Sequence, residues 1–323
     1  MPGRYCGALS MQADTFFFDE IQNTSGWEQF ARFMLDENYK VFITGSNAKM
    51  LSKEPGNKLT GRHLSIELFP FSYKEYLDFT NTKADAGTTA GYLKHGCFPE
   101  MLKTGLPEIL MQVFNDILIR DIAVRHNIKN TLTLQQLAVW LISNSGKLTS
   151  GNNLRKMFAI DSSASIMEYL SFFNDAYLFF FVPKFSYSQK VQIVNPKKVY
   201  AIDTGLVNVN STSFSDDLGR VFENLVFLHL RRQTRDIYYF SEEKECDFVI
   251  LKNERPAALY QVCLELNRDS MSRELDGLVA AMDFLNMDGG IIVTMNQADI
   301  FEIRNKTITA IPFHEWALQE PGT

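Results

Sequence analysis

Two adjacent carboxylates follow an aromatic run near the start of the chain. TFFF (15–18) leads directly into Asp19 and Glu20. The aromatic run predicts a strand buried on both faces of a parallel sheet, and such strands end at the crevice where these sheets bind ligands. Two neighbouring carboxylates repel each other unless a cation or a polarised water lies between them. A solvated strand end is the alternative.

The residues after these acids predict a strand–helix–strand unit. GWEQFARFMLDEN (26–38) has apolar residues spaced near 3.6, which indicates a helix. KVFITGS (40–46) indicates a second short buried strand that ends at Gly45. This order is the repeating unit of a parallel α/β sheet, and it puts Ser46 and Asn47 at the end of the second strand.

Three stretches in this order resemble the prokaryotic AAA+-type ATPases that carry a C-terminal domain of unknown function. They are FFFDE (16–20), ITGSNAKML (43–51) and LTGRHLSIELFPFSYKEYL (59–77). The resemblance continues through HGCFPEML (95–102), LIRDIAVRHNI (118–128), NPKKVYAIDTGL (195–206), GRVFENLVFLHLRR (219–232) and KECDFVI (244–250). It therefore covers nearly everything after residue 15.

The resemblance implies ATP and Mg²⁺ as cofactors and assigns roles at the strand ends. Asp19 would hold Mg²⁺, and Glu20 would orient the attacking water as in other nucleotide hydrolases. Asn47, next to Ser46, would be the sensor near the γ-phosphate. Arg62 would be an arginine finger or phosphate sensor, and a finger that acts in trans would require a homo-oligomer.

One departure from the family pattern concerns the P-loop. That loop needs GxxxxGK[ST], whose backbone N–H groups and lysine hold the phosphates. The sequence has no such run, since its single Gly-Lys pair, Gly146-Lys147, is followed by Leu148. We expect an N-terminally truncated relative without Walker A, which binds ATP poorly and does not hydrolyse it. The alternative is a non-enzymatic binding module left from such an ATPase.

The last part of the chain predicts a small mixed sheet. A helix over 216–233 precedes strands at 237–241, 246–252 and 257–266, and a helix (269–286) and a strand (289–295) follow. This α-β-β-β-α-β order, with Glu223 on the helix and Asp247 on a strand, resembles the PD-(D/E)xK nuclease fold. There, carboxylates hold a divalent metal and a lysine polarises the attacking water.

The nuclease-like site is degenerate. Gln261 and Cys263 stand where that fold has the Glu and Lys of Glu-x-Lys. Glutamine lacks the charge of a tight metal ligand and cysteine does not replace a cation, so we expect an inactive fold or a binding module. Two alternatives stay open. Glu223 forms a salt bridge with Arg220 or Arg231, or Glu265, four residues after Gln261, serves as a substitute acid on the same face.

The middle of the chain predicts three helices and then a strand, in winged-helix order. Their sequences are LTLQQLAVWLISNSG (132–146), NNLRKMFAI (152–160) and SASIMEYLSFFNDAYLFFFV (163–182). Arg155 and Lys156 on the second helix could contact DNA phosphates. Residues 111–235 hold 14 lysines and arginines against 9 acids. The alternative for this block is domain packing.

Composition and boundaries complete the expectations. The net charge of −6 gives no global signal for nucleic acid, and no apolar run reaches the ~18 residues of a membrane helix, so we expect a cytoplasmic protein.

The fold class is α/β, with a partial P-loop-type parallel sheet, a winged-helix-like middle and a nuclease-like end. The predicted domains are 1–80 (truncated ATPase), 81–130 (helical lid or linker, with 80–91 as linker), 131–200 (winged-helix-like) and 201–323 (nuclease-like). Further helices are expected after the turn in 66–79 and around 107–126.

Overall fold

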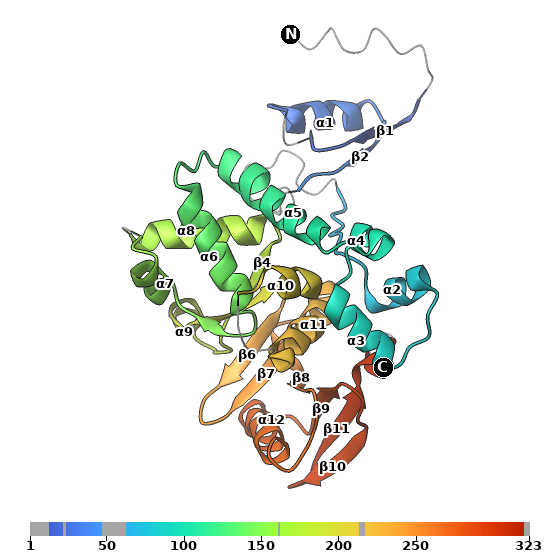
Figure 1. The fold of residues 1–323 in the computed structure, drawn as a ribbon, viewed down its shortest axis with the longest axis vertical. Helices are drawn as coiled ribbons and strands as arrows, with labels where there is room; N and C mark the ends of the chain where they lie inside the picture. The colour runs from blue at the N-terminus through green and yellow to red at the C-terminus, as the bar shows by residue number, and fades with distance from the viewer. Residues whose placement is uncertain (1–12, 22–23, 47–62, 161, 213–216, 320–323) are drawn as a thin grey trace. The chain divides into compact units, whose positions relative to one another are not determined.

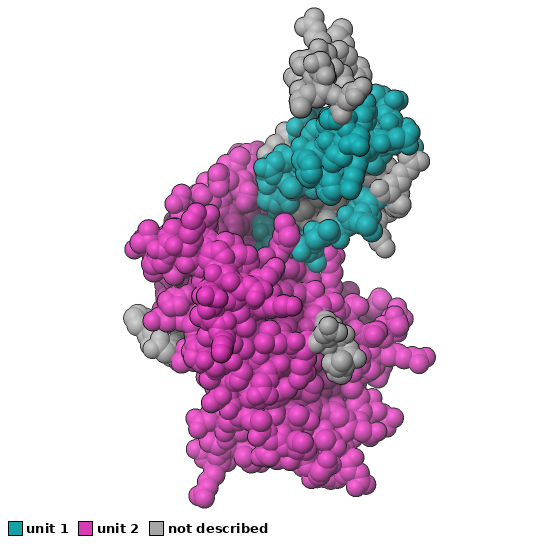
Figure 2. All heavy atoms as spheres, turned by 90° about the vertical axis from the view of Figure 1, so that its right-hand side faces the viewer, with its two compact units in different colours: residues 1–67, 175–177 teal, residues 68–174, 178–323 magenta. Residues whose placement is uncertain are grey.

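The computed structural model describes residues 13–21, 24–46, 63–160, 162–212 and 217–319. They form a mixed α/β structure with both parallel and antiparallel sheets (Figure 1). The chain divides into two units, one of residues 1–67 with 175–177 and one of residues 68–174 with 178–323 (Figure 2). The α/β class predicted from the sequence is confirmed.

The first unit contains the predicted strand–helix–strand. Strands β1 (Thr15–Phe18) and β2 (Lys40–Ile43) pair in parallel, and helix α1 (Trp27–Asp36) connects them. Parallel strands need such a crossover because the chain must return to the same end of the sheet before it pairs. The parallel α/β unit is therefore confirmed in this part of the chain.

The two faces of this strand pair differ from the prediction. Phe18 packs edge-on against Phe30 of α1, with ring centroids 5.3 Å apart. Phe17 points to the opposite face, where it is 75% exposed and stacks on Phe42 at 4.7 Å. The prediction that β1 is buried on both faces is wrong, because α1 covers the Phe18 face of this two-stranded sheet.

Five helical segments open the second unit. They are α2 (Tyr73–Thr80), α3 (Ala86–His95), α4 (Pro99–Thr104), α5 (Glu108–Asp116) and the π-helix η3 (Ile117–Val124). The helix expected after the turn in 66–79 and the two expected around 107–126 are confirmed.

The prediction of a linker over residues 80–91 is wrong in its second half. Helix α3 begins there because Asp85 caps it, accepting a hydrogen bond from the backbone N–H of Thr88 at 2.7 Å. The Thr88 hydroxyl accepts the Asp85 N–H in return, at 2.9 Å. These two bonds offset the low helix propensity of the Gly- and Thr-rich sequence.

The next elements combine short helices with a three-stranded antiparallel sheet. They are α6 (Thr131–Ser143), β3 (Leu148–Thr149), α7 (Gly151–Met157), α8 (Ser163–Asp175), β4 (Phe179–Val182), α9 (Gln189–Val194) and β5 (Lys197–Ala201). The strand order is β3-β5-β4, with β5 in the centre. The three predicted helices and the strand after them are confirmed, whereas the sequence pattern does not predict α9 or β5.

The rest of the chain builds a six-stranded sheet between helices. Its elements are α10 (Thr204–Asn210), α11 (Leu218–Gln233), β6 (Ile237–Ser241), β7 (Glu245–Lys252), β8 (Arg255–Cys263), α12 (Met271–Leu285), β9 (Gly289–Thr294), β10 (Asp299–Ile303), β11 (Lys306–Pro312) and α13 (Phe313–Trp316). The strand order is β10-β11-β9-β8-β7-β6, and β9 pairs in parallel with both β8 and β11. The predicted α-β-β-β-α-β order is confirmed as α11, β6, β7, β8, α12 and β9.

Two helices cover this sheet and bring β5 close to it. Helix α12 packs on β7, β8 and β9, where Leu278 and Val249 are fully buried. Helix α11 packs on β8 and β5. Phe227 of α11 stacks on Tyr200 of β5 at 4.3 Å and lies 6.2 Å from Phe248 of β7. These aromatic contacts place side chains of β5 beside those of α11 and β7.

The helices are short compared with a lipid bilayer. The 16-residue helix α11 falls below the ~20 residues that a membrane-spanning helix needs. Over the described ranges, no helix is long and apolar enough to cross a membrane.

Candidate functional site

The predicted N-terminal carboxylates lie at the carboxyl end of β1. Because β1 and β2 are parallel, the residues after β2 reach the same edge of the pair. The Thr44 hydroxyl donates a hydrogen bond to Asp19 and accepts one from the Glu20 N–H at 3.2 Å. The Ser46 hydroxyl donates to a Glu20 carboxylate oxygen at 3.3 Å. The structure thus brings Asp19, Glu20 and Ser46 together.

The environment of these acids is open. Both carboxylates are exposed, and Glu20 adopts a left-handed backbone conformation with φ of 48°, which is uncommon for a residue with a side chain. Carboxylate and hydroxyl oxygens are the hard ligands that Mg²⁺ accepts, usually together with waters and substrate phosphates. The two other predicted nucleotide-site residues, Asn47 and Arg62, lie outside the described residues.

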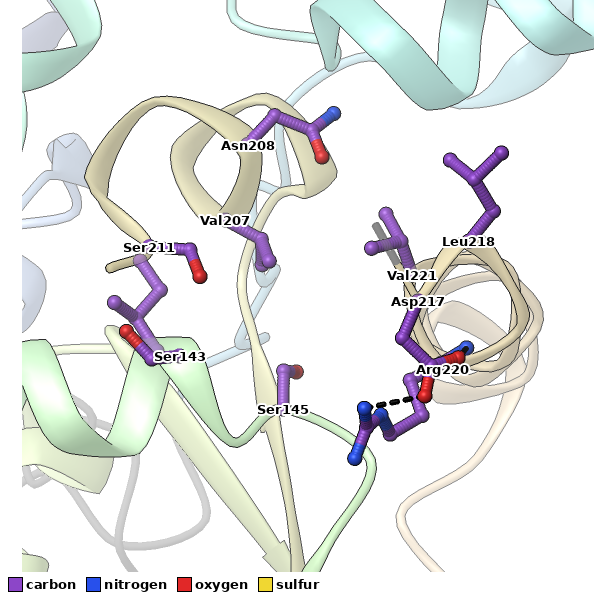
Figure 3. Close-up of a pocket in the computed structure, with 10 residues that line it drawn as sticks. Ser143, Ser145, Val207, Asn208, Ser211, Asp217, Leu218, Arg220 and Val221 are labelled. Atoms are coloured by element: carbon purple, nitrogen blue, oxygen red, sulfur yellow. Dashed lines mark hydrogen bonds and ion pairs between the residues drawn. The ribbon is translucent and has the colours of Figure 1, made fainter. Parts of the chain in front are cut away.

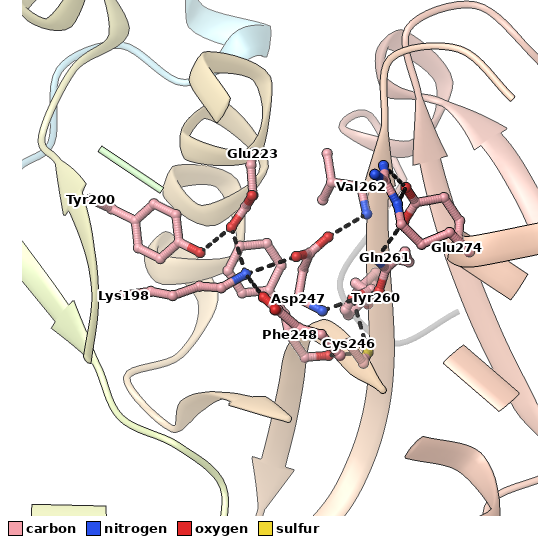
Figure 4. A network of polar contacts seen from close by, with 12 residues as sticks. Lys198, Tyr200, Glu223, Cys246, Asp247, Phe248, Tyr260, Gln261, Val262 and Glu274 are labelled. Carbon is pink, nitrogen blue, oxygen red and sulfur yellow. Dashed lines mark hydrogen bonds and ion pairs between the residues drawn. The ribbon is translucent and has the colours of Figure 1, made fainter. Parts of the chain in front are cut away.

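A second cluster of ionisable groups lies within the second unit, where β5 meets α11 and β7 (Figure 4). Its centre is the ammonium of Lys198, a residue that is only 3% exposed. The Nζ atom lies 2.8 Å from Asp247 Oδ1 and 3.0 Å from Glu223 Oε1. It also lies 2.7 Å from Glu245 Oε1. The Tyr200 hydroxyl donates to Glu223 Oε1 at 2.5 Å.

Burial and charge act in opposite directions on these groups. Burial disfavours the Lys198 ammonium, but the Asp247 and Glu223 carboxylates hold the pKa of Lys198 well above its usual value. Burial raises the pKa of Glu223 to about 7, although Lys198 opposes that rise. Burial, reinforced by Glu223, also raises the pKa of the Tyr200 hydroxyl, so this group remains a hydrogen-bond donor at neutral pH.

The network continues through β8 to α12. Asp247 accepts the Val262 N–H at 2.9 Å through its second oxygen, and its own N–H donates to the Gln261 side-chain oxygen at 3.2 Å. The Gln261 amide then donates to Glu274 at 2.5 Å. Glu274 is 3% exposed and also accepts from Arg273 at 2.5 Å. Each buried carboxylate in the chain of contacts therefore has an internal partner.

The structure gathers most of the residues predicted for the nuclease-like site. Glu223, Asp247 and Gln261 lie in one network, whereas the Cys263 thiol donates to the Glu265 backbone oxygen at 3.1 Å. Glu265 itself is exposed, whereas Gln261 is buried, and Glu265 lies two residues beyond Cys263, the last residue of β8. The strand alternation on which its expected position depends ends before Glu265, and its role as a substitute acid stays a prediction.

The expected partner of Glu223 also differs. Arg220 forms its ion pair with Asp217, and the Arg231 guanidinium lies 5.3 Å from the ring centroid of Phe180. The cation found against Glu223 is Lys198.

Sequence reasoning missed several members of this network, including Lys198, Tyr200, Glu245 and Glu274. Lys198 follows a second lysine in the strand KKVYA and precedes its apolar residues, and a buried lysine is rare unless it is paired. Glu274 lies on the α12 side that faces the sheet, next to the apolar residues of its helix. In the described part of the chain, no group of three or more His, Cys, Asp or Glu side chains has an arrangement that could hold a metal ion.

A small pocket lies between α6, α10 and the start of α11 (Figure 3). Its polar lining includes Ser143, Asn208 and the Asp217–Arg220 ion pair. Its volume of about 120 Å³ is well below the ~300–1,000 Å³ of typical small-molecule sites. The pocket is therefore smaller than a typical small-molecule site.

A buried aspartate joins two of the segments that carry the family resemblance. Asp203 is completely buried and accepts the Cys97 N–H at 2.7 Å and the Leu206 N–H at 2.9 Å. The Cys97 thiol donates to the same carboxylate at 3.0 Å. The glycines on both sides are required, because a Cβ at Gly96 or Gly205 would lie within 3 Å of the Asp203 carboxylate. This contact holds the turn before α4 against the start of α10.

Comparisons with known proteins agree with an ATPase-like first part. Residues 4–77 match the model of an AAA domain, and residues 88–217 match a domain of unknown function, DUF8612. The first match includes both exposed acids and the polar residues after β2. The chain therefore combines an AAA-like domain with a domain of unknown function.

Two relatives extend the similarity over almost the whole chain. An uncharacterized protein of Methanocaldococcus jannaschii, MJ1544, is 34% identical over 342 aligned residues, which cover 96% of this chain and 76% of the relative. An uncharacterized protein of Haemophilus influenzae is 29% identical over 318 residues, which cover 94% of this chain and 77% of that relative. The chain belongs to the same protein family as the Methanocaldococcus jannaschii protein. No solved structure matches it significantly.

Proposed function

We propose that the chain is an ATP-binding protein of the AAA+-type ATPase family and that its nucleotide site is the carboxyl edge of β1 and β2. The observation that carries this proposal is the meeting of Asp19, Glu20 and Ser46 at that edge, inside the segment that matches an AAA domain. Parallel sheets bind their ligands at this edge. The exposure of both acids leaves them accessible to a ligand.

The residues present fit a magnesium-bound phosphate chemically. Asp19 would hold Mg²⁺, which when bound neutralises charge on the phosphate oxygens. Glu20 would accept a hydrogen bond from the attacking water, and Ser46 would orient the Glu20 carboxylate. We assign Asn47 as the sensor of the γ-phosphate and Arg62 as an arginine finger that would act between copies of the chain.

ATP hydrolysis depends on the P-loop as well as on the acids at this edge. Phosphate binding in this family depends on GxxxxGK[ST], and the 323 residues contain no such run. We expect this polypeptide to bind Mg²⁺–ATP weakly and to lack turnover, and we assign hydrolysis to a form that carries a P-loop.

The test is equilibrium binding of a fluorescent ATP analogue with and without Mg²⁺. We expect weak, Mg²⁺-dependent binding that Asp19→Asn removes, whereas Glu37→Gln, an exposed acid after α1, leaves it unchanged. Equal binding by Asp19→Asn and the unmodified chain would refute the site. Magnesium-dependent turnover that Glu20→Gln abolishes would contradict the expected lack of hydrolysis.

We also propose, as a second candidate, that the second unit is a non-enzymatic nucleic-acid or protein binding module with a degenerate nuclease-like fold. The supporting observation is that internal contacts engage Glu223, Asp247 and Gln261, the residues that a nuclease would use. The α6-to-β5 segment, with its β3-β5-β4 sheet, supports a winged-helix-like block that could contact DNA. The four predicted domains remain part of this proposal.

Duplex DNA tests the binding role. We expect Arg155→Ala with Lys156→Ala to weaken binding and to reduce its salt dependence, and Lys252→Ala on β7 to have little effect. No binding at low salt would remove DNA as the partner and leave a protein partner. Manganese-dependent plasmid cleavage that Asp247→Ala abolishes would contradict the non-enzymatic role.

A further inference from the structure

The Lys198 ammonium is fully coordinated by protein. An ammonium group has three N–H donors, and three carboxylates lie within 3.0 Å of Nζ: Glu223, Glu245 and Asp247. Glu223 lies on α11, whereas Glu245 and Asp247 lie on β7. Lys198 lies on β5. Lys198 therefore supplies the positive charge for three carboxylates that lie on other elements than its own strand.

The same cluster does not suit a divalent metal. Asp247 gives one oxygen to Lys198 and the other to the Val262 N–H. The Gln261 oxygen accepts the Asp247 N–H, so it is not directed at a shared ligand position. Burial raises the pKa of the Cys263 thiol, which keeps it protonated and unsuited to metal binding. A metal ion would have to displace a buried ammonium that already forms ion pairs with three carboxylates.

We propose that Lys198 is an internal substitute for a divalent cation and that the Glu223–Asp247 cluster of the unmodified protein is closed to metal ions. The ion pairs of this cluster hold β5 of the three-stranded sheet against α11 and β7. This inference does not depend on the nucleotide proposal, because none of these residues belongs to the first unit.

The proposal predicts a gain of metal binding when the ammonium is removed. Lys198→Met keeps the length of the apolar stem but leaves the carboxylates without a counter-charge, which a cation can then supply. We expect this variant to bind Mn²⁺ more tightly than the unmodified chain by about tenfold or more, because an uncompensated buried charge is strongly unfavourable. Lys197→Met is the matched control, since Lys197 precedes Lys198 on β5 and points to the opposite face.

The measurement is Mn²⁺ titration followed by electron paramagnetic resonance at pH 8, with Asp19→Asn in every protein so that the first unit does not contribute. In the Lys198→Met chain, adding Asp247→Asn should remove the gained site. Unchanged Mn²⁺ affinity in folded Lys198→Met would overturn the proposal.

A second arm needs no Lys198 variant. With Lys198 in place, Asp247→Asn should leave Mn²⁺ binding unchanged, because the cluster is already closed. Loss of a bound Mn²⁺ ion on this substitution would show that the cluster takes metal beside Lys198 and would overturn the proposal even where Lys198→Met does not fold.

Discussion

Glu223 gives the protein a pH-dependent stability whose sign follows from its burial. Burial raises the pKa of Glu223 from 4.5 to about 7, against the opposing effect of Lys198. Below pH 4.5 the carboxyl is protonated in both the folded and the unfolded chain. As the pH rises from 4.5 to 7, the unfolded chain loses this proton first, so the free energy of unfolding falls. Above pH 7 the contribution is constant.

The magnitude follows from the difference between the two pKa values. A pKa difference of one corresponds to about 1.4 kcal/mol, so a rise from 4.5 to about 7 corresponds to about 3 kcal/mol. The Glu223 side chain is only 13% exposed, so solvent screening removes little of this amount. Glutamine has a similar shape and no proton to lose. Glu223→Gln should therefore lack this part of the pH dependence.

The assay is urea unfolding between pH 4.5 and 8, followed by circular dichroism and tryptophan fluorescence. The free energy of unfolding of the unmodified chain minus that of Glu223→Gln should fall by roughly 3 kcal/mol over this range. Glu243→Gln, an exposed acid between β6 and β7, controls for the loss of one negative charge and should show a nearly flat difference. A flat difference for Glu223→Gln as well would refute the reasoning, because it would mean that Glu223 titrates like an exposed acid.

Two further substitutions test the packing that positions the network. Asp203→Asn replaces one acceptor oxygen with an NH₂ group that faces backbone N–H donors, so we expect a loss of about 2 kcal/mol in the free energy of unfolding, against little change for exposed Asp236→Asn. A loss as small as that of the control would show that the carboxylate bonds contribute nothing net. A Cβ at Gly277 of α12 would lie 2.2 Å from the Glu245 backbone oxygen, so Gly277→Ala should destabilise the chain by about 1–3 kcal/mol in the same assay. Gly289→Ala has its nearest atom at 3.9 Å and should cost much less, and equal losses would contradict this packing account.

Local patterns predict the elements that carry strong apolar periodicity. The β1–α1–β2 unit and the order from α11 to β9 follow from short apolar runs and helical spacing, which depend on neighbouring residues. The edge shared by Asp19 and Ser46 is predictable for the same reason. Once two strands are parallel, their carboxyl ends coincide whatever the rest of the chain does.

The β10–β11 hairpin lacks such a signal. Its turn residues, Arg304 and Asn305, both have positive φ, the conformation that Asn-Gly or Asp-Gly pairs usually mark. Its first strand, β10, has the sequence DIFEI and is mostly exposed. Its apolar and polar residues do not alternate clearly. The sequence therefore gives neither the turn nor the buried face.

The ion-pair network is unpredictable for a different reason, which is distance along the chain. Lys198 lies 25 residues from Glu223 and 49 from Asp247, and Gln261 lies 13 from Glu274. No helix or strand period links such positions, because tertiary packing alone sets their approach. Residue type gives little help at β5, because this strand begins with two lysines and only Lys198 is buried.

The two acidic sites show why residue type alone does not decide whether carboxylates bind an external cation. Asp19 is exposed and accepts a hydrogen bond from the neutral hydroxyl of Thr44, and Glu20 beside it is also exposed. Glu223 and Asp247 are buried, and the ammonium of Lys198 already neutralises part of their charge. A metal ion would gain little at Glu223 and Asp247, because it would first have to displace the buried ammonium of Lys198 from its ion pairs. We therefore expect burial and the existing counter-charge of Lys198, rather than the number of acids, to keep a metal ion from the Glu223–Asp247 cluster.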